Sequence, residues 1–102
     1  MADLQQILQL SQQMQGRLQQ LQSDLADRMV EATAGGGLVR VKADGRGMIR
    51  DLTIDPAAFD GRDAELLADL VLSAVAEVQR RAAETAQAEM RKVQGLPGLP
   101  GL

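Results

Sequence analysis

Residues 38–45, Leu-Val-Arg-Val-Lys-Ala-Asp-Gly, decide the fold of this 102-residue chain. Their side chains alternate strictly, with apolar residues on one face and Arg40 and Lys42 on the other. A period of two is typical of an antiparallel strand with one buried and one solvated face. The Asp44-Gly45 pair at its end favours a two-residue hairpin turn, because both positions tolerate a positive φ. The segment therefore predicts the central strand of a small sheet.

Two further strands are predicted on either side of this segment. Residues 28–34 alternate in the same way, and the glycines at 35–37 supply the connecting turn. Residues 48–54 form the third strand, and the Asp-Pro pair after them ends it, since proline cannot donate to a ladder. The apolar residues of this strand are out of phase by one step. We therefore expect a β-bulge near Arg50 and Asp51.

Long amphipathic helices are predicted before and after the strands. Residues 4–25 place apolar side chains at alternating steps of three and four within a Gln-rich sequence, and residues 64–93 carry a second stripe. Asp60 and Asp63 are both candidate N-caps for the second helix. The helices would run ~33 Å and ~45 Å, whereas a seven-residue strand spans ~23 Å. We expect the Leu-rich start of the first helix to face the Ala-rich end of the second, as a projecting arm.

Composition predicts one domain at residues 1–94 and a flexible Gly/Pro/Leu tail at residues 95–102. The chain is 45% hydrophobic, and Phe59, its only aromatic residue, is expected in the core. Aromatic residues supply much of the buried area of a small core, so this shortage favours self-association. No apolar run is long enough to span a bilayer, and no signal sequence opens the chain. We expect a cytoplasmic protein with no membrane partner.

Catalysis has little chemistry available in this sequence. The chain contains no Cys and no His, so thiolate metal sites, a histidine base and a cysteine nucleophile are all absent. Its aspartates fall mainly at strand ends, turns and helix starts, where capping explains them. We expect no enzyme activity, no metal and no cofactor.

The charge distribution is more informative than the formal net charge of −3. Residues 32–50 and 80–102 are locally basic within an acidic protein. Such cations can neutralise nucleic-acid phosphates and release counterions. The candidate phosphate-binding residues are Arg40, Lys42, Arg46, Arg50, Arg80, Arg81, Arg91 and Lys92.

An ordinary solvated surface is the simpler explanation of the same cations, since surface charge is common. On the strands, Lys42 would pair with Asp51 across the hairpin, and on the second helix Glu77 would pair with Arg81 at i,i+4. A single aromatic residue excludes base stacking as a main mode of binding. Helix-turn-helix and zinc-finger spacings are both missing, so sequence-specific reading of the major groove is unsupported.

Several short motifs in a fixed order carry a family resemblance. They are Met14-Gln15, Gly-Gly-Leu-Val-Arg-Val at 36–41, Asp44-Gly45, Ile54-Asp55-Pro56, Leu-Leu-Ala-Asp-Leu-Val at 66–71 and Leu-Pro-Gly-Leu at 96–99. Together they resemble the YbaB/EbfC family of nucleoid-associated proteins over nearly the whole chain. The resemblance implies an α+β fold in the order α-β-β-β-α, with a three-stranded antiparallel sheet and two long helices.

The resemblance also implies a function. It implies a homodimer joined through the sheet region, with helical arms that bind double-stranded DNA on the bacterial nucleoid with little sequence specificity. The family has no catalytic residues to carry over. This chain departs from the family pattern in its opening helix, where Gln replaces most of the usual Lys and leaves only Arg17. Any DNA contact then shifts to the hairpin cations, which are Arg40, Lys42, Arg46 and Arg50, and to the arginines of the second helix.

Two hypotheses follow from the sequence. The first is a homodimeric, non-catalytic DNA-binding protein of the nucleoid. The second is a protein-interaction adaptor with weak or no DNA binding, suggested by the acidic total, the neutral Gln-rich helix and the tail at 95–102.

Overall fold

The computed structural model describes residues 3–61 and 63–94. In chain order the elements are α1 (Leu4–Asp27), β1 (Met29–Ala34), β2 (Val39–Asp44), β3 (Ile49–Ile54), the 3-10 helix η1 (Pro56–Phe59) and α2 (Ala64–Gln94). The predicted α-β-β-β-α order is confirmed, and the predicted boundaries lie within one or two residues of the observed ones. Only the short η1 turn was not predicted. The predicted tail at 95–102 lies outside the described residues.

The three strands form one antiparallel sheet in the order β1-β2-β3. Lys42 of β2 pairs with Asp51 of β3, but the next residue, Ala43, pairs with Ile49. Arg50 is therefore an extra residue in β3, and the expected bulge is confirmed. A bulged residue leaves the strict alternation of the strand, so its side chain can be aimed independently of its neighbours.

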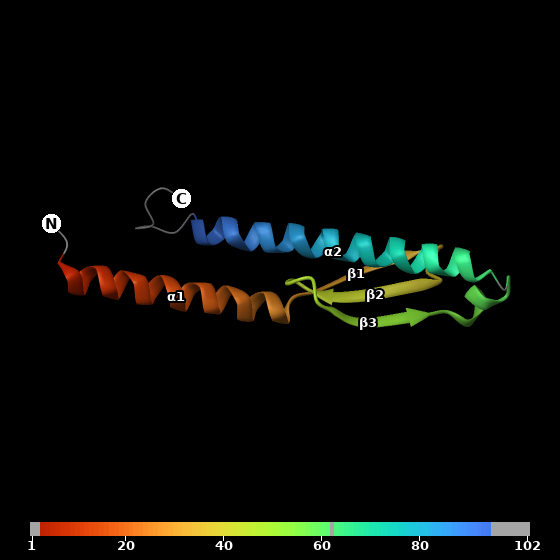
Figure 1. The fold of residues 1–102 in the computed structure, drawn as a ribbon, viewed down its shortest axis with the longest axis horizontal. Coiled ribbons are helices and arrows are strands. Elements are labelled where there is room, and N and C mark those ends of the chain that lie inside the picture. Colours follow the sequence, from red (N-terminus) through yellow and green to blue (C-terminus); the bar gives the residue numbers. More distant parts are fainter. Residues whose placement is uncertain (1–2, 62, 95–102) are drawn as a thin grey trace.

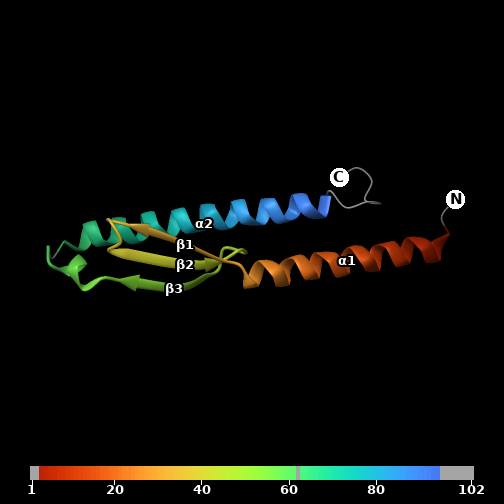
Figure 2. The same ribbon diagram turned by 180° about the vertical axis from the view of Figure 1, so that it is seen from behind.

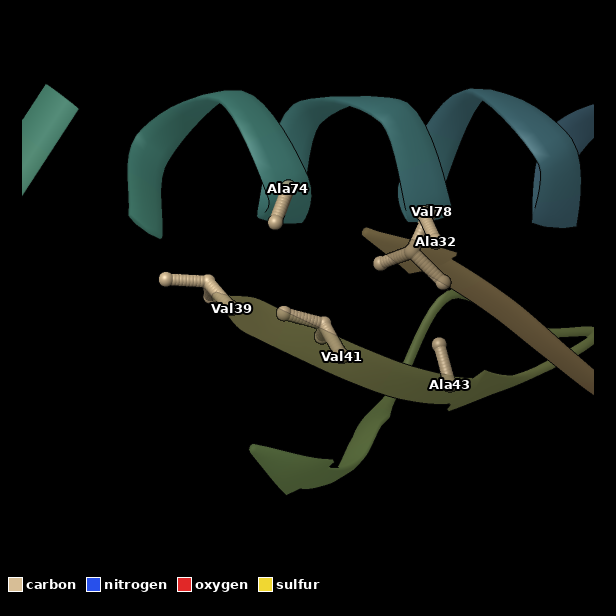
Figure 3. Close-up of a cluster of buried hydrophobic side chains, with 6 residues drawn as sticks. All are labelled: Ala32, Val39, Val41, Ala43, Ala74 and Val78. Atoms are coloured by element: carbon tan, nitrogen blue, oxygen red, sulfur yellow. The ribbon is translucent and has the colours of Figure 1, made fainter. Parts of the chain in front are cut away.

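The core lies between the sheet and the first half of α2 (Figure 3). Val39 and Val41 of β2 are fully buried, and Ala74 and Val78 of α2 face them. Alanines on both sides let the helix approach the strands closely, which compensates for the shortage of large side chains. Leu67, Leu70, Val71 and Val75 pack around this centre and are partly buried. The predicted α2 stripe is thus confirmed.

The sheet is covered unevenly. α2 packs on β1 and β2, and β3 lies farthest from it in both views (Figures 1 and 2). Leu52 pairs with the buried Val41 and so faces the same side of the sheet, yet it remains 40% exposed, as does Ile49. Phe59 on η1 is 56% exposed. Its predicted place in the core is therefore wrong: η1 follows β3, the strand that α2 leaves uncovered, and Phe59 lines an open pocket beside the start of α2.

α1 lies beyond the sheet as a projecting arm (Figure 1). Its C-terminal half runs antiparallel beside the end of α2, while its N-terminal half extends past it. Only Leu21 and Leu25 are buried, and Leu4 is 72% exposed. The expected contact between the start of α1 and the Ala-rich end of α2 is wrong, because α1 begins farther from the sheet than α2 ends. The chain measures 70 × 19 × 17 Å.

The β2–β3 hairpin differs from the predicted two-residue turn. The N–H of Gly47 donates to the carbonyl of Asp44 (3.0 Å), and Gly47, with a φ of 88°, carries the left-handed conformation. Gly45 is required for another reason: its N–H donates to the Leu25 carbonyl at the end of α1 (2.8 Å), and a Cβ there would lie 3.0 Å from that oxygen. The hairpin tip is therefore docked against α1.

Candidate nucleic-acid interface

The candidate cations fall into separate groups on the molecule. Arg40 and Lys42 lie on the sheet face away from α2, because their neighbours Val39, Val41 and Ala43 face the helix (Figure 3). The same alternation places Asp44, at the end of β2, on this outer face, and Arg46 and Arg50 gather around it. The remaining four candidates lie on α2, across the sheet or on the arm.

Asp44 holds the hairpin arginines together. Its side chain is fully buried, and Oδ1 accepts hydrogen bonds from the backbone N–H groups of Arg46 (2.9 Å) and Met48 (3.2 Å). Oδ2 accepts from Nη2 of Arg46 (2.9 Å) and Nε of Arg50 (3.1 Å). Burial alone would raise the pKa of Asp44, but the bonds from Arg46, Met48 and Arg50 outweigh it and lower the pKa to about 2. The carboxylate is therefore ionised at neutral pH.

The two arginines around Asp44 keep part of their surface in solvent. The Arg46 side chain is 38% exposed and the Arg50 side chain 49% exposed. Arg50 donates to Asp44 through Nε. Among the residues that the structure describes, its Nη1 and Nη2 have no hydrogen-bond partner. That end of a guanidinium is the fork that binds phosphate bidentately.

The two cations on β2, Arg40 and Lys42, differ in whether they form an ion pair. Nη1 of Arg40 pairs with Oε1 of Glu31 across the strands at 3.4 Å, and both side chains are exposed. Lys42 stands opposite Asp51 in the register, but no ion pair joins them. Lys42 forms none with any other residue in ranges 3–61 and 63–94. The predicted Lys42–Asp51 pair is therefore wrong, and Lys42 is a free positive charge on the outer face.

The arginines in the middle of α2 are engaged with carboxylates on their own helix. Arg80 binds Glu77 (2.6 Å) and Glu84, and Arg81 binds Glu77 (3.1 Å), as predicted. Hydrogen bonds from Arg80, and from Arg81 after it, lower the pKa of Glu77 to about 2 against its partial desolvation. Nη1 of Arg81 also donates to the Glu31 carbonyl of β1 (2.6 Å). Arg81 therefore ties α2 to the sheet edge.

The end of α2 carries the last two candidates. Lys92 pairs with Glu89 (3.1 Å), which also binds Arg28 at the α1–β1 junction (2.6 Å). Arg91 is exposed, and no ion pair links it to any described residue. Sequence reasoning missed Arg28, because no local pattern places residue 28 beside residue 89.

The structure thus brings Arg46 and Arg50 together at one carboxylate and places Arg40 and Lys42 on the same face. The α2 cations Arg80, Arg81 and Lys92 instead pair with carboxylates of their own helix. Sequence reasoning treated Asp44 only as a turn residue and so missed its part in the site. The signal was available in outline, because an aspartate at the start of a turn commonly accepts the N–H two residues later.

Other kinds of site find no support in the part of the chain that the structure describes. Within it, no group of three or more carboxylate, His or Cys side chains could hold a metal ion. No helix within the same residues is long and apolar enough to cross a membrane.

Fold and surface together define a class: small α+β proteins with one antiparallel sheet, a projecting helical arm and an arginine-bearing hairpin. The family model for the YbaB/EbfC DNA-binding family matches residues 1–96, and the chain belongs to this family. A nucleoid-associated protein of Acetivibrio thermocellus is 46% identical over 90% of this chain and 82% of its own length. One of Thermobifida fusca is 43% identical over 98% of this chain and 94% of its own length.

A solved structure has the same fold. The crystal structure of uncharacterized protein HP0035 from Helicobacter pylori superposes with a TM-score of 0.82 and 25% identity. It covers 93% of this chain and 100% of its own. The two proteins therefore share this fold over most of the present chain.

Proposed function

We propose that this protein binds double-stranded DNA on the bacterial nucleoid as a non-catalytic homodimer with little sequence specificity. The observation that carries the proposal is the match of residues 1–96 to a DNA-binding family. The hairpin geometry supports it, because Arg46, Arg50 and Lys42 present charge on one face, with the fork of Arg50 open to a phosphate. Phosphate contacts carry no sequence information, which is the reason for proposing low specificity.

The candidate cations Arg80, Arg81 and Lys92 on α2 already form ion pairs with carboxylates. These pairs are compatible with DNA binding, but they make α2 a weaker candidate than the hairpin for the main phosphate contact. Exposed pairs such as Arg80–Glu84 contribute little to stability, so a phosphate can replace the carboxylate. Arg81 also donates to a β1 carbonyl, and Lys92 shares Glu89 with Arg28. The proposal therefore assigns the main DNA contact to the hairpin and secondary contacts to α2.

Exposed apolar surface supports the homodimer. Ile49 and Leu52 form a row on β3 that α2 leaves uncovered. The accessible surface is 7308 Å², against about 5,600 Å² for a compact monomer of this mass. A standard interface takes about 800 Å² from each partner, so a second copy can account for about half of the difference. Sedimentation should give a dimer, and a stable folded monomer at working concentration would contradict this part of the proposal.

Fluorescence anisotropy with a labelled duplex tests DNA binding directly. Affinity should fall steeply as salt is raised and should differ little between duplexes of unrelated sequence. Arg50→Gln should weaken binding to all duplexes alike. Arg17→Gln makes the same change in charge on α1, away from the hairpin, and should have a smaller effect. Absence of any complex at low salt and micromolar protein would refute the proposal.

A protein-interaction adaptor is the second candidate function, and one observation favours it. The apolar stripe of α1 is exposed over its N-terminal half, with Ile7 54% and Leu8 53% accessible. Residues 4–16 contain no charged side chain, so this face can bind the apolar surface of a partner whatever the charge of that partner. A partner that remains bound after nuclease treatment would support this function. Loss of that partner on removing residues 95–102 would place the contact on the tail instead of α1.

A further inference from the structure

Asp44 sits where a simple phosphate-binding surface would not place a negative charge. Its carboxylate is fully buried directly beneath the two arginines that the proposed function assigns to DNA. A carboxylate that only neutralised them would weaken the surface. The geometry suggests another role, because Oδ2 is bound by both guanidiniums while Oδ1 is held by the backbone of the turn.

This arrangement leaves little freedom to either guanidinium. Arg46 bonds through Nε (3.3 Å) and Nη2 (2.9 Å) to the same oxygen, which fixes the plane of its guanidinium. Arg50 reaches that oxygen through Nε from the bulge in β3. Both side chains are thus anchored on their inner side, while about two-fifths to a half of each remains exposed. Two like charges are held next to each other without mutual repulsion driving them apart.

We propose that Asp44 is a positioning residue that presents Arg46 and Arg50 to one DNA phosphate as a single preorganised unit. The inference rests on the proposed DNA binding. Free arginine side chains lose rotamer entropy when they order on a phosphate, whereas these two are ordered before DNA arrives. The turn supplies the anchor, since backbone N–H groups of Arg46 and Met48 fix the carboxylate itself.

Positioning and simple electrostatics predict opposite signs for Asp44→Asn. An asparagine oxygen can still accept the two backbone N–H bonds, but its NH₂ group cannot accept from a guanidinium. The variant gains one unit of positive charge, which alone would tighten binding. The ordering cost of the two released arginines opposes that gain, and the positioning role requires that this cost is the larger of the two. We expect the affinity of Asp44→Asn for duplex DNA to fall by about three- to tenfold.

Asp51→Asn is the matched control. Asp51 lies exposed on the same face, and none of the described cations pairs with it. Its amide changes the net charge by the same amount without releasing an arginine, so affinity should rise slightly. Opposite effects of the two variants at equal net charge support positioning. Equal or tighter binding by Asp44→Asn overturns it.

A second comparison separates positioning from damage to the hairpin. In an Arg46→Gln/Arg50→Gln background, Asp44→Asn should no longer change affinity, since there is nothing left to position. A loss that persists in that background overturns the inference and assigns Asp44 a purely structural role. Nε–Hε NMR signals of Arg46 and Arg50 should be sharp in the free wild type and averaged in Asp44→Asn. If the wild type itself binds no duplex, both the proposed DNA binding and the positioning role of Asp44 are refuted. If the wild type binds but Asp44→Asn and Asp51→Asn change the affinity alike, only the positioning role is refuted.

Discussion

The two long helices carry similar apolar stripes but meet different surroundings. The α2 stripe lies on the sheet, where Ala74 and Val78 are completely buried. The α1 stripe leaves Leu4, Ile7 and Leu8 more than half exposed, and only its last two turns are covered. The contrast teaches that amphipathic periodicity identifies a face that favours burial, but does not say whether its partner belongs to the same chain.

The largest effect is expected where the sheet and α2 meet. Val41→Ala should lower the free energy of unfolding by about 2–3 kcal/mol, because it removes two buried methyl groups and leaves a cavity under Ala74. Urea unfolding followed by circular dichroism measures this. A loss below about 0.5 kcal/mol would mean that the pairing of β2 with α2 does not form the main core.

Acid should weaken the hairpin in a defined pH window. The folded-state pKa of Asp44 is about 2, below the ordinary value of 3.8, so its contribution is complete above pH 4 and is lost as pH falls through 2. The difference amounts to roughly 2 kcal/mol. Urea midpoints measured across this window should fall more steeply in the wild type than in Asp44→Asn. Glu77 titrates in the same range in both proteins, so the difference between their two curves of urea midpoint against pH is due to Asp44. Parallel curves would contradict this assignment.

The sheet and its core could be predicted from the sequence, because both depend on local period. Alternation in β2 identified the buried face, and the phase slip in β3 located the bulge at Arg50. The turn could not be fully predicted. The turn sequence Asp-Gly-Arg-Gly contains two glycines, and the Asp-Gly signal predicts a positive φ at the first, Gly45. In the structure Gly45 packs against α1 instead, and Gly47 has the positive φ.

The candidate site was predictable only as a set of residue types. The identity of the cations follows from composition, but their availability depends on contacts between distant residues, as for Arg28 with Glu89 or Arg81 with the Glu31 carbonyl. Lys42 was assigned an ion pair that it does not make, while the buried role of Asp44 went unseen. Charge patterns along a strand locate the basic face, and tertiary contacts decide which charges on it are free.

Gly45→Ala tests the contact between the β2–β3 hairpin and the C-terminal end of α1. The added Cβ would lie 3.0 Å from the Leu25 carbonyl oxygen, and backbone cannot yield as a flexible side chain does. We expect a loss of about 1–2 kcal/mol and faster hydrogen exchange in the last turns of α1. Gly16→Ala is the control: its Cβ would meet nothing within 4 Å, and it should stabilise α1 by about 0.5–1 kcal/mol. Equal effects of the two substitutions would mean that the hairpin does not orient the arm.

The smallest effect on folding is expected on the exposed arm. Leu8→Gln keeps a good helix former and removes a side chain that is 53% exposed, so the free energy of unfolding should change by less than about 0.5 kcal/mol. Urea unfolding at several protein concentrations makes this test informative. A small, concentration-independent change means that the α1 stripe has no partner within this protein. A loss approaching that of Val41→Ala at high protein concentration, and shrinking in dilute solution where two copies separate, would mean that a second copy covers α1; the contrast between the helices would then hold only within a single chain.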